Sequence, residues 1–111
     1  MSSAPQLILS ALLMMAAAVP AHAQSKAAAK QQAVHAGQQV FTQRCFQCHS
    51  VLPDQVRFGP SLHGELSKPH PRKTDAQVRQ ILQNGRNKMP SFKGVLTKED
   101  TDNLLAYLHS L

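Results

Sequence analysis

The sequence predicts a small all-α domain in which three helices are joined by long loops. Three observations favour this class. Apolar residues recur at three- and four-residue spacing in three separate stretches, two of those stretches open with helix-capping residues, and no stretch reads convincingly as a strand. The chain has 111 residues, which limits it to one small domain. Its two cysteines exclude a framework of several disulfides.

The N-terminal segment has the pattern of a secretory signal peptide. Residues 7–19 are an uncharged apolar run, too short to span a bilayer, which takes roughly 17–25 residues. Pro20 ends the run, and Ala21-His22-Ala23 follows as a small-x-small cleavage site. Because residues 1–6 carry no Lys or Arg, an uncleaved membrane anchor is the alternative. We expect a cleaved signal peptide over 1–23, a flexible lead or helix extension over 24–32, and a periplasmic domain over 33–111.

The first helix is predicted from Ala33 onward, up to the first cysteine. Its members with helical spacing are Val34, Gly37, Val40, Phe41, Arg44 and Cys45. A glycine inside a helix costs about 1 kcal/mol relative to alanine. Gly37 therefore indicates that another helix crosses close by.

A long loop follows over residues 50–73, with four prolines and two glycines. A loop of this length inside a compact domain normally wraps something functional. The run Thr74-Asp75-Ala76-Gln77 is a capping box, which opens a second helix that ends at Asn84-Gly85. The apolar face of that helix comprises Val78, Ile81 and Leu82.

Residues 86–96 form a second loop, with Met89-Pro90 at its centre. The last helix starts at Thr97-Lys98-Glu99-Asp100, with acidic residues in the first turn, where the helix dipole favours them. Its predicted buried stripe comprises Leu104, Tyr107, Leu108 and Leu111. After removal of the signal peptide, the chain is poor in apolar residues for its size, so a cofactor, a metal or a disulfide is expected to complete the interior.

The strongest motif is Cys45-Phe46-Gln47-Cys48-His49, because a C-x-x-C-H run is typical of c-type haem attachment. Two thiols at this spacing reach the two vinyl groups of one haem, and the next residue offers its imidazole to the iron. Three alternatives remain. A thioredoxin-like redox pair lacks its βαβ context, a zinc site lacks a second cysteine pair, and a plain disulfide leaves His49 unexplained.

The sixth ligand follows by elimination. Three of the four methionines lie in the signal segment, so Met89 is the one thioether of residues 24–111. It lies in a loop rich in cations, and Pro90 stiffens the chain beside it. The alternative is that Met89 has no ligand role and fills a gap in the core. The rival ligands, each weaker, are His35, His63, His70 and His109.

These motifs together resemble the class I monohaem cytochromes c, over essentially all of residues 33–111. The similar segments are Gly37-x-x-x-Phe41-x-x-x-Cys45, the stretch Phe58 to Gly64, Met89-Pro90-x-Phe92, and Leu104 to Leu108. The resemblance implies the cytochrome c fold, with three main helices and long loops wrapped around one covalent haem c. It also implies that the Pro60 carbonyl accepts the His49 N–H. The chain has no Trp, so the Trp contact to a haem propionate is missing, and Arg57 or a loop lysine could replace it.

The expected function is one-electron transfer in the periplasm, through a haem held by Cys45 and Cys48 and ligated by His49 and Met89. This ligand pair raises the haem potential and leaves no open coordination position. The alternative is a dedicated cytochrome c subunit of a periplasmic dehydrogenase or sulfur-oxidising complex. A peroxidase or gas sensor, in which Met89 is displaced, is a weaker alternative.

The formal net charge of +6 predicts an electrostatically steered partner. Arg86, Lys88 and Lys93 flank Met89, and Lys68, Arg72 and Lys73 could extend the same patch. We expect an acidic redox protein as partner and no nucleic acid, because the chain carries no nucleic-acid-reading motif. We also expect no transmembrane segment after signal cleavage, and either a monomer or a subunit of a redox complex.

Overall fold

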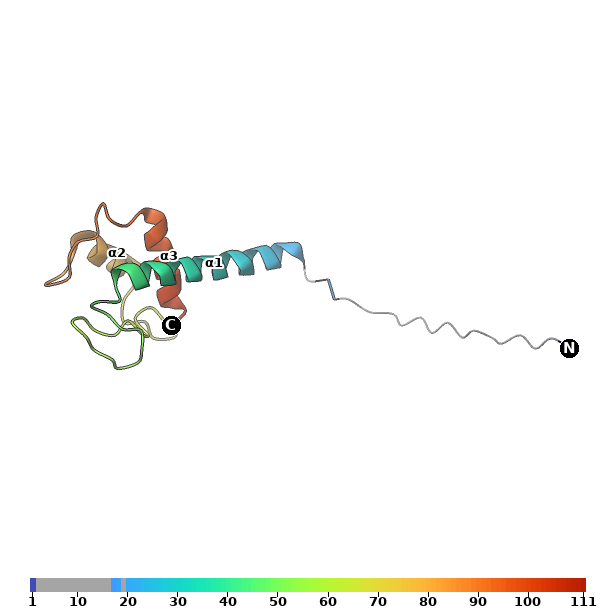
Figure 1. The fold of residues 1–111 in the computed structure, drawn as a ribbon, viewed down its shortest axis with the longest axis horizontal. Helices are drawn as coiled ribbons and strands as arrows, with labels where there is room; N and C mark the ends of the chain where they lie inside the picture. The colour runs from blue at the N-terminus through green and yellow to red at the C-terminus, as the bar shows by residue number, and fades with distance from the viewer. Residues whose placement is uncertain (2–16, 19) are drawn as a thin grey trace.

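Three helices make up the regular structure of the part of the chain that is described, as the sequence predicts. The computed structural model describes residues 1, 17–18 and 20–111. The helices are α1 (Ala21–Arg44), α2 (Asp75–Asn84) and α3 (Lys98–His109), as Figure 1 shows. Within these residues no strand forms, and the one β-type pairing is an isolated bridge between Arg86 and Met89. The all-α class is therefore confirmed.

The expected signal peptide falls mostly outside the described residues, because residues 2–16 and 19 are not among them. Residues 21–32 are helical and belong to α1 (Figure 1). Their side chains are exposed wherever they are described. Among the described residues, no helix is both long enough and apolar enough to cross a membrane.

Helices α1 and α3 cross in direct contact at Gly37. A Cβ on residue 37 would lie 1.9 Å from the carbonyl oxygen of Asn103 and 2.8 Å from Cβ of Tyr107. One turn further along α1, the Phe41 ring lies 5.8 Å from the Tyr107 ring, centroid to centroid. The close approach that Gly37 predicts is present, and it brings together two helices from opposite ends of the chain.

The starts of α2 and α3 are fixed by two complete capping boxes. Thr74 Oγ1 accepts the Gln77 N–H at 3.2 Å, and Gln77 Oε1 accepts the Thr74 N–H at 2.9 Å. At α3, Thr97 Oγ1 accepts the Asp100 N–H at 3.0 Å, and Asp100 Oδ2 accepts the Thr97 N–H at 2.9 Å. Each box satisfies two backbone donors that the first helical turn leaves unpaired.

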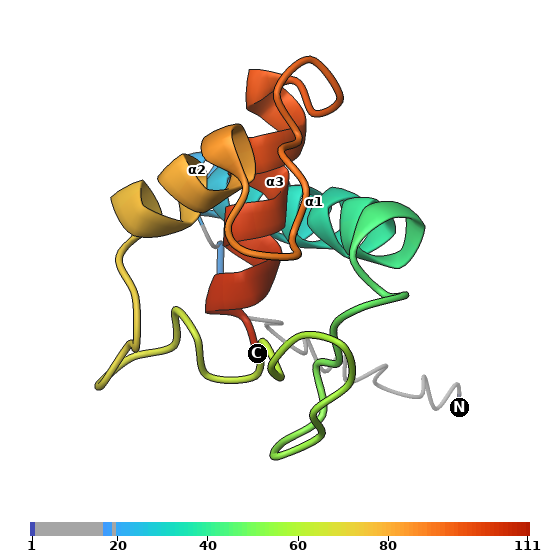
Figure 2. The ribbon, with the colours of Figure 1, turned by 90° about the vertical axis from the view of Figure 1, so that its left-hand side faces the viewer.

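The core combines buried residues of all three helices with Cys45 and Leu66, which lie outside them. Ile81 and Leu111, expected to be buried, are only half-buried, while Leu105 and Leu66 join the interior. The buried apolar residues are Phe41, Cys45, Leu66, Val78, Leu82, Leu104, Leu105, Tyr107 and Leu108. Both long loops lie at the end of the molecule away from the start of α1 (Figures 1 and 2). The loop of residues 50–73 is tied to the C-terminus, where the Ser67 hydroxyl donates to the Leu111 carbonyl.

Candidate functional site

The C-x-x-C-H segment forms a tight turn directly after α1. The Cys45 N–H continues the helical pattern by donating to Phe41 O at 2.8 Å. The N–H groups of Cys48 and His49 then both donate to Cys45 O, at 3.1 and 2.9 Å. The turn therefore holds both thiols and the imidazole within one compact segment.

The two thiols differ in environment. Both are free, but Cys45 is buried while Cys48 is exposed. Burial raises the pKa of the Cys45 thiol to about 11, and the neighbouring Cys48 adds a smaller upward contribution. Cys45 is consequently a neutral thiol at neutral pH, and it packs as part of the core.

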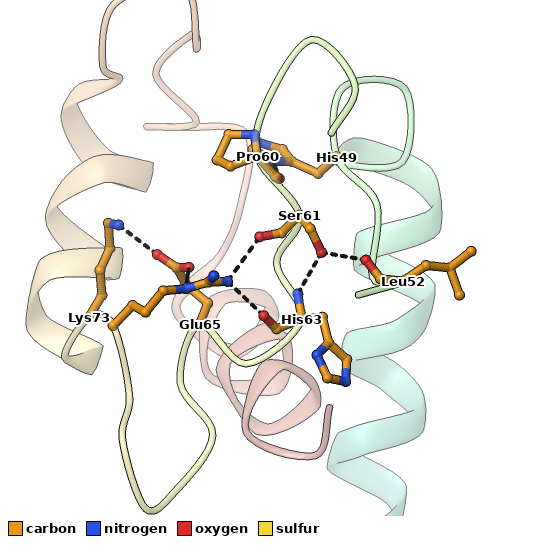
Figure 3. A network of polar contacts seen from close by, with 8 residues as sticks. His49, Leu52, Pro60, Ser61, His63, Glu65 and Lys73 are labelled. Carbon is orange, nitrogen blue, oxygen red and sulfur yellow. Dashed lines mark hydrogen bonds and ion pairs between the residues drawn. The ribbon is translucent and has the colours of Figure 1, made fainter. Parts of the chain in front are cut away.

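His49 is buried and its ring orientation is fixed. Its Nδ1 lies 2.8 Å from the Pro60 carbonyl oxygen. Figure 3 shows the two residues next to each other. Because a carbonyl can only accept, Nδ1 carries the proton and Nε2 keeps a free lone pair. The lone pair makes Nε2 the ring atom that can ligate a metal.

Gly59 allows this arrangement. A Cβ on residue 59 would lie 2.4 Å from Cε1 of His49, so any side chain there would displace the ring. The Gly59 N–H also donates to Cys48 O at 2.7 Å, and the Leu62 N–H donates to Ser50 O at 2.8 Å. The loop that carries Pro60 is thus bonded directly to the segment that follows the second cysteine.

Met89 comes from the loop between α2 and α3. Arg86 and Met89 pair reciprocally, with N–H···O distances of 3.0 and 2.8 Å, around a positive φ of 52° at Asn87. Gly85, with φ of 73°, lies so close to Met89 O that a Cβ would approach it to 2.8 Å. Met89 itself is half-buried and packs against the core.

The basic residues of the two long loops fall into two groups. Arg86, Lys88 and Lys93 are exposed, as a docking surface requires. Arg72 and Lys73 instead pair with the buried carboxylate of Glu65, at 2.9 and 2.6 Å. These two cations therefore hold a loop together, and their charge is partly compensated.

The four rival histidines are all exposed. His109 pairs with Asp75 across 2.7 Å, between the end of α3 and the start of α2. His63 lies in the same loop as Pro60, but its ring points away from His49 (Figure 3). His35 lies on α1 and His70 in the long loop.

Two arrangements near the site were not anticipated from the sequence. Arg57 lies over the Phe46 ring, 4.4 Å from its centroid, and donates to the Phe46 carbonyl at 2.9 Å. It thereby covers one face of Phe46, the residue that follows the first cysteine. The Glu65 carboxylate and its two cations form the second arrangement, and no spacing or periodicity in the sequence signals either contact.

The residues present fit a covalently bound haem. A C-x-x-C pair of unbridged thiols is followed by an imidazole whose Nε2 is free, and a half-buried thioether lies on the other long loop. This is the donor set of c-type attachment with one nitrogen and one sulfur axial ligand.

Comparison with known proteins gives the family. The model of the family described as "Cytochrome C oxidase, cbb3-type, subunit III" matches residues 32–108. A cytochrome c6 of Gracilaria tenuistipitata var. liui is 32% identical over 78 residues, covering 66% of this chain and 68% of that protein. A cytochrome c6 of Pyropia tenera is 29% identical over 74 residues, covering 67% and 87%.

A cytochrome c6-like protein of Nostoc sp. is 26% identical over 72 residues and covers 65% of each chain. No solved structure gives a significant match. The matched residues contain the C-x-x-C-H turn, the Pro60 loop, the Met89 loop and α3. The chain therefore belongs to the cytochrome c family, as a small class I monohaem member, and is a haem-based electron-transfer protein rather than a catalytic enzyme.

Proposed function

We propose that the chain holds one haem c through thioether bonds to Cys45 and Cys48, with His49 and Met89 as axial ligands. In this state it carries single electrons between periplasmic or membrane redox partners. The observation that carries the proposal is the His49–Pro60 hydrogen bond of 2.8 Å, which leaves Nε2 free. Gly59 supports the same ring orientation, because a Cβ on residue 59 would lie 2.4 Å from Cε1 of His49.

Each protein group has a distinct task in this proposal. The haem iron supplies the Fe(II)/Fe(III) couple. Pro60 O fixes the Nδ1 proton of His49 and makes Nε2 more basic. Met89 contributes a neutral thioether, which favours Fe(II), and the core around Cys45 and Leu66 excludes water.

The proposed partner is an acidic redox protein that docks near Met89. Arg86, Lys88 and Lys93 are exposed on the loop that carries this residue. A cluster of one sign of charge beside the electron exit raises the encounter rate and orients the partner, which suits a short-lived complex.

The test is expression of the full chain in a host that attaches c-type haem. Haem should stay on the denatured chain, a redox titration should fit a single one-electron couple, and the exported protein should begin at Gln24. Haem that is extractable by acid–acetone would contradict the covalent attachment. If the exported protein still carries residues 1–23, this segment is an uncleaved membrane anchor and not a signal peptide.

A second candidate is a fixed subunit of a larger redox enzyme. One observation favours it: the matching family model is described as an oxidase subunit. Size-exclusion chromatography of native periplasm separates the two candidates. A free carrier elutes alone at its own size, whereas a subunit elutes together with its enzyme.

A further inference from the structure

A buried carboxylate lies at the centre of the loop that supports His49. The side chain of Glu65 is only 8% exposed and accepts from Arg72 Nε at 2.9 Å and from Lys73 Nζ at 2.6 Å. Its side chain has two cationic partners, which offset the free-energy cost of burying a carboxylate. We call Glu65, Arg72, Lys73 and the carbonyls of Ser61 and His63 the Glu65 network (Figure 3).

Arg72 differs from Lys73 in what else it contacts. Its Nη2 donates to His63 O at 2.6 Å and to Ser61 O at 3.3 Å, while Nε remains on Glu65. The planar guanidinium can serve all three oxygens at once, because its donors diverge in a fixed fork. Lys73 has its single recorded side-chain bond to Glu65.

Ser61 follows Pro60 directly, so the Ser61 carbonyl belongs to the peptide unit next to the one that accepts the His49 proton. The same serine hydroxyl donates to Leu52 O at 2.6 Å and accepts the His63 N–H at 3.2 Å. Arg72 therefore holds the Pro60 segment from one side, while the residues after Cys48 hold it from the other.

We infer that Arg72, oriented by Glu65, is a positioning residue for His49: it fixes the Pro60 carbonyl and thereby the strength of the Nδ1–H···O bond. This inference rests on the proposed function, because the His49 bond tunes the iron only when His49 is the axial ligand. A weaker bond at Nδ1 makes Nε2 less basic, so loss of Arg72 raises the reduction potential.

The test compares three variants of the haem-loaded protein, in the reduced state. Arg72→Met removes the fork, Arg72→Lys keeps the charge without the fork, and Lys73→Met removes the other ion pair of Glu65. NMR gives the hydrogen-exchange rate of the His49 Nδ1 proton, redox titration gives the potential, and thermal unfolding gives the stability.

We expect exchange to rise about tenfold in both Arg72 variants, as loss of one charge-assisted hydrogen bond allows. Both Arg72 variants should also have a raised potential. Lys73→Met should change neither the exchange rate nor the potential, although its thermal stability should fall because Glu65 loses one of its two cationic partners. Equal effects in all three variants, or exchange that simply follows thermal stability, would mean that the Glu65 network only holds the loop together.

The outcomes separate this inference from the proposed function. If His49 ligates the haem but the exchange rate of its Nδ1 proton does not change when Arg72 is replaced, the inference alone is overturned. Wild-type protein that attaches no haem in the maturation host overturns the proposed function and the inference with it.

Discussion

The backbone carbonyl of Asn103 occupies the place where a side chain on residue 37 would begin, 1.9 Å from the ideal Cβ position of Gly37. Backbone atoms of two helices cannot shift apart without disturbing the contacts around Phe41 and Tyr107. The crossing therefore leaves no room for a side chain on residue 37.

Gly37→Ala tests this crossing by the sign of its effect. In an isolated helix the change is stabilising by about 1 kcal/mol, because glycine is a poor helix former. Here the clash should reverse the sign and lower the free energy of unfolding by about 1–3 kcal/mol. Denaturant unfolding of the haem-loaded protein measures it. Gln38→Ala, on the exposed side of the same helix, should stay within about 0.5 kcal/mol of wild type.

Cys45→Ser and Cys48→Ser should each impair haem attachment, because a serine hydroxyl forms no thioether. Mass spectrometry of the denatured protein measures the haem-bearing fraction. Gln47→Ala, which is exposed between the two cysteines, should leave this fraction unchanged. Full haem retention in a variant that lacks both thiols would rule out covalent attachment through this motif.

Met89→Ala should abolish the weak iron–sulfur absorption band near the red end of the oxidised spectrum and lower the reduction potential, with haem retained. The potential should fall because water or a stronger donor in place of the thioether favours Fe(III). His70→Ala serves as the control and should leave the band in place. An unchanged spectrum in Met89→Ala would transfer the ligand role to another residue, with His70 the first to examine.

The rate of electron transfer to an acidic partner should fall markedly as ionic strength rises through about 0.1 M, where the Debye length is about 10 Å. Lys93→Gln should lower the low-salt rate and flatten the salt dependence. Lys26→Gln, on the exposed start of α1, should change neither. A salt-independent rate for the wild-type protein would exclude the Met89 loop as an electrostatic docking surface.

The capping box of α3 should make the stability of the protein depend on pH. Hydrogen bonds from Thr97, the backbone N–H first, lower the pKa of Asp100 below its ordinary value of 3.8. A carboxyl with a lowered folded-state pKa stabilises the protein above its unfolded pKa and loses that contribution as pH falls through the folded value. Asp100→Asn should therefore be less stable than wild type at neutral pH, and the difference should shrink as pH falls below 3.8 and through the lowered folded-state pKa of Asp100.

Unfolding at several pH values measures this difference. Glu99→Gln lies in the same first turn without the reciprocal bond, so it separates the cap from the helix dipole. A stability loss in Asp100→Asn that persists unchanged in strong acid would show that the carboxylate charge has no part in it.

Local signals explain why much of the fold could be predicted. The start of α2 depends on a capping box that is complete in the sequence and in the structure. The start of α3 is predicted from Thr97 and the acidic residues after it, and in the structure Asp100 closes a second capping box. Gly37 likewise signals a crossing through its own cost in a helix. The length of α1 was less determined, because residues 24–32 are rich in Ala, Lys and Gln and have no apolar face that would set a boundary.

The sequence predicts which residues form the candidate site, but not the contacts that hold them in place. Motif spacing identifies Cys45, Cys48 and His49, while the pairing of Glu65 with Arg72 depends on how a proline-rich loop turns back on itself. Neither helical nor strand periodicity governs such a loop, so residues seven and eight positions apart meet without a sequence signal. Lys68, Arg72 and Lys73 consequently looked alike in the sequence, although Glu65 binds only the last two.

The contact between α1 and α3 also imposes an order of events during synthesis. Phe41 has one aromatic partner nearby in the sequence, Phe46, but the other, Tyr107, lies in α3, so a chain that emerges N-terminus first cannot complete the burial of Phe41 until α3 has been made. The intervening segment must also close as a loop, at an entropic cost that contacts of low sequence separation avoid. A nascent chain therefore presents its cysteine pair in an unpacked state until α3 is available to pack against α1.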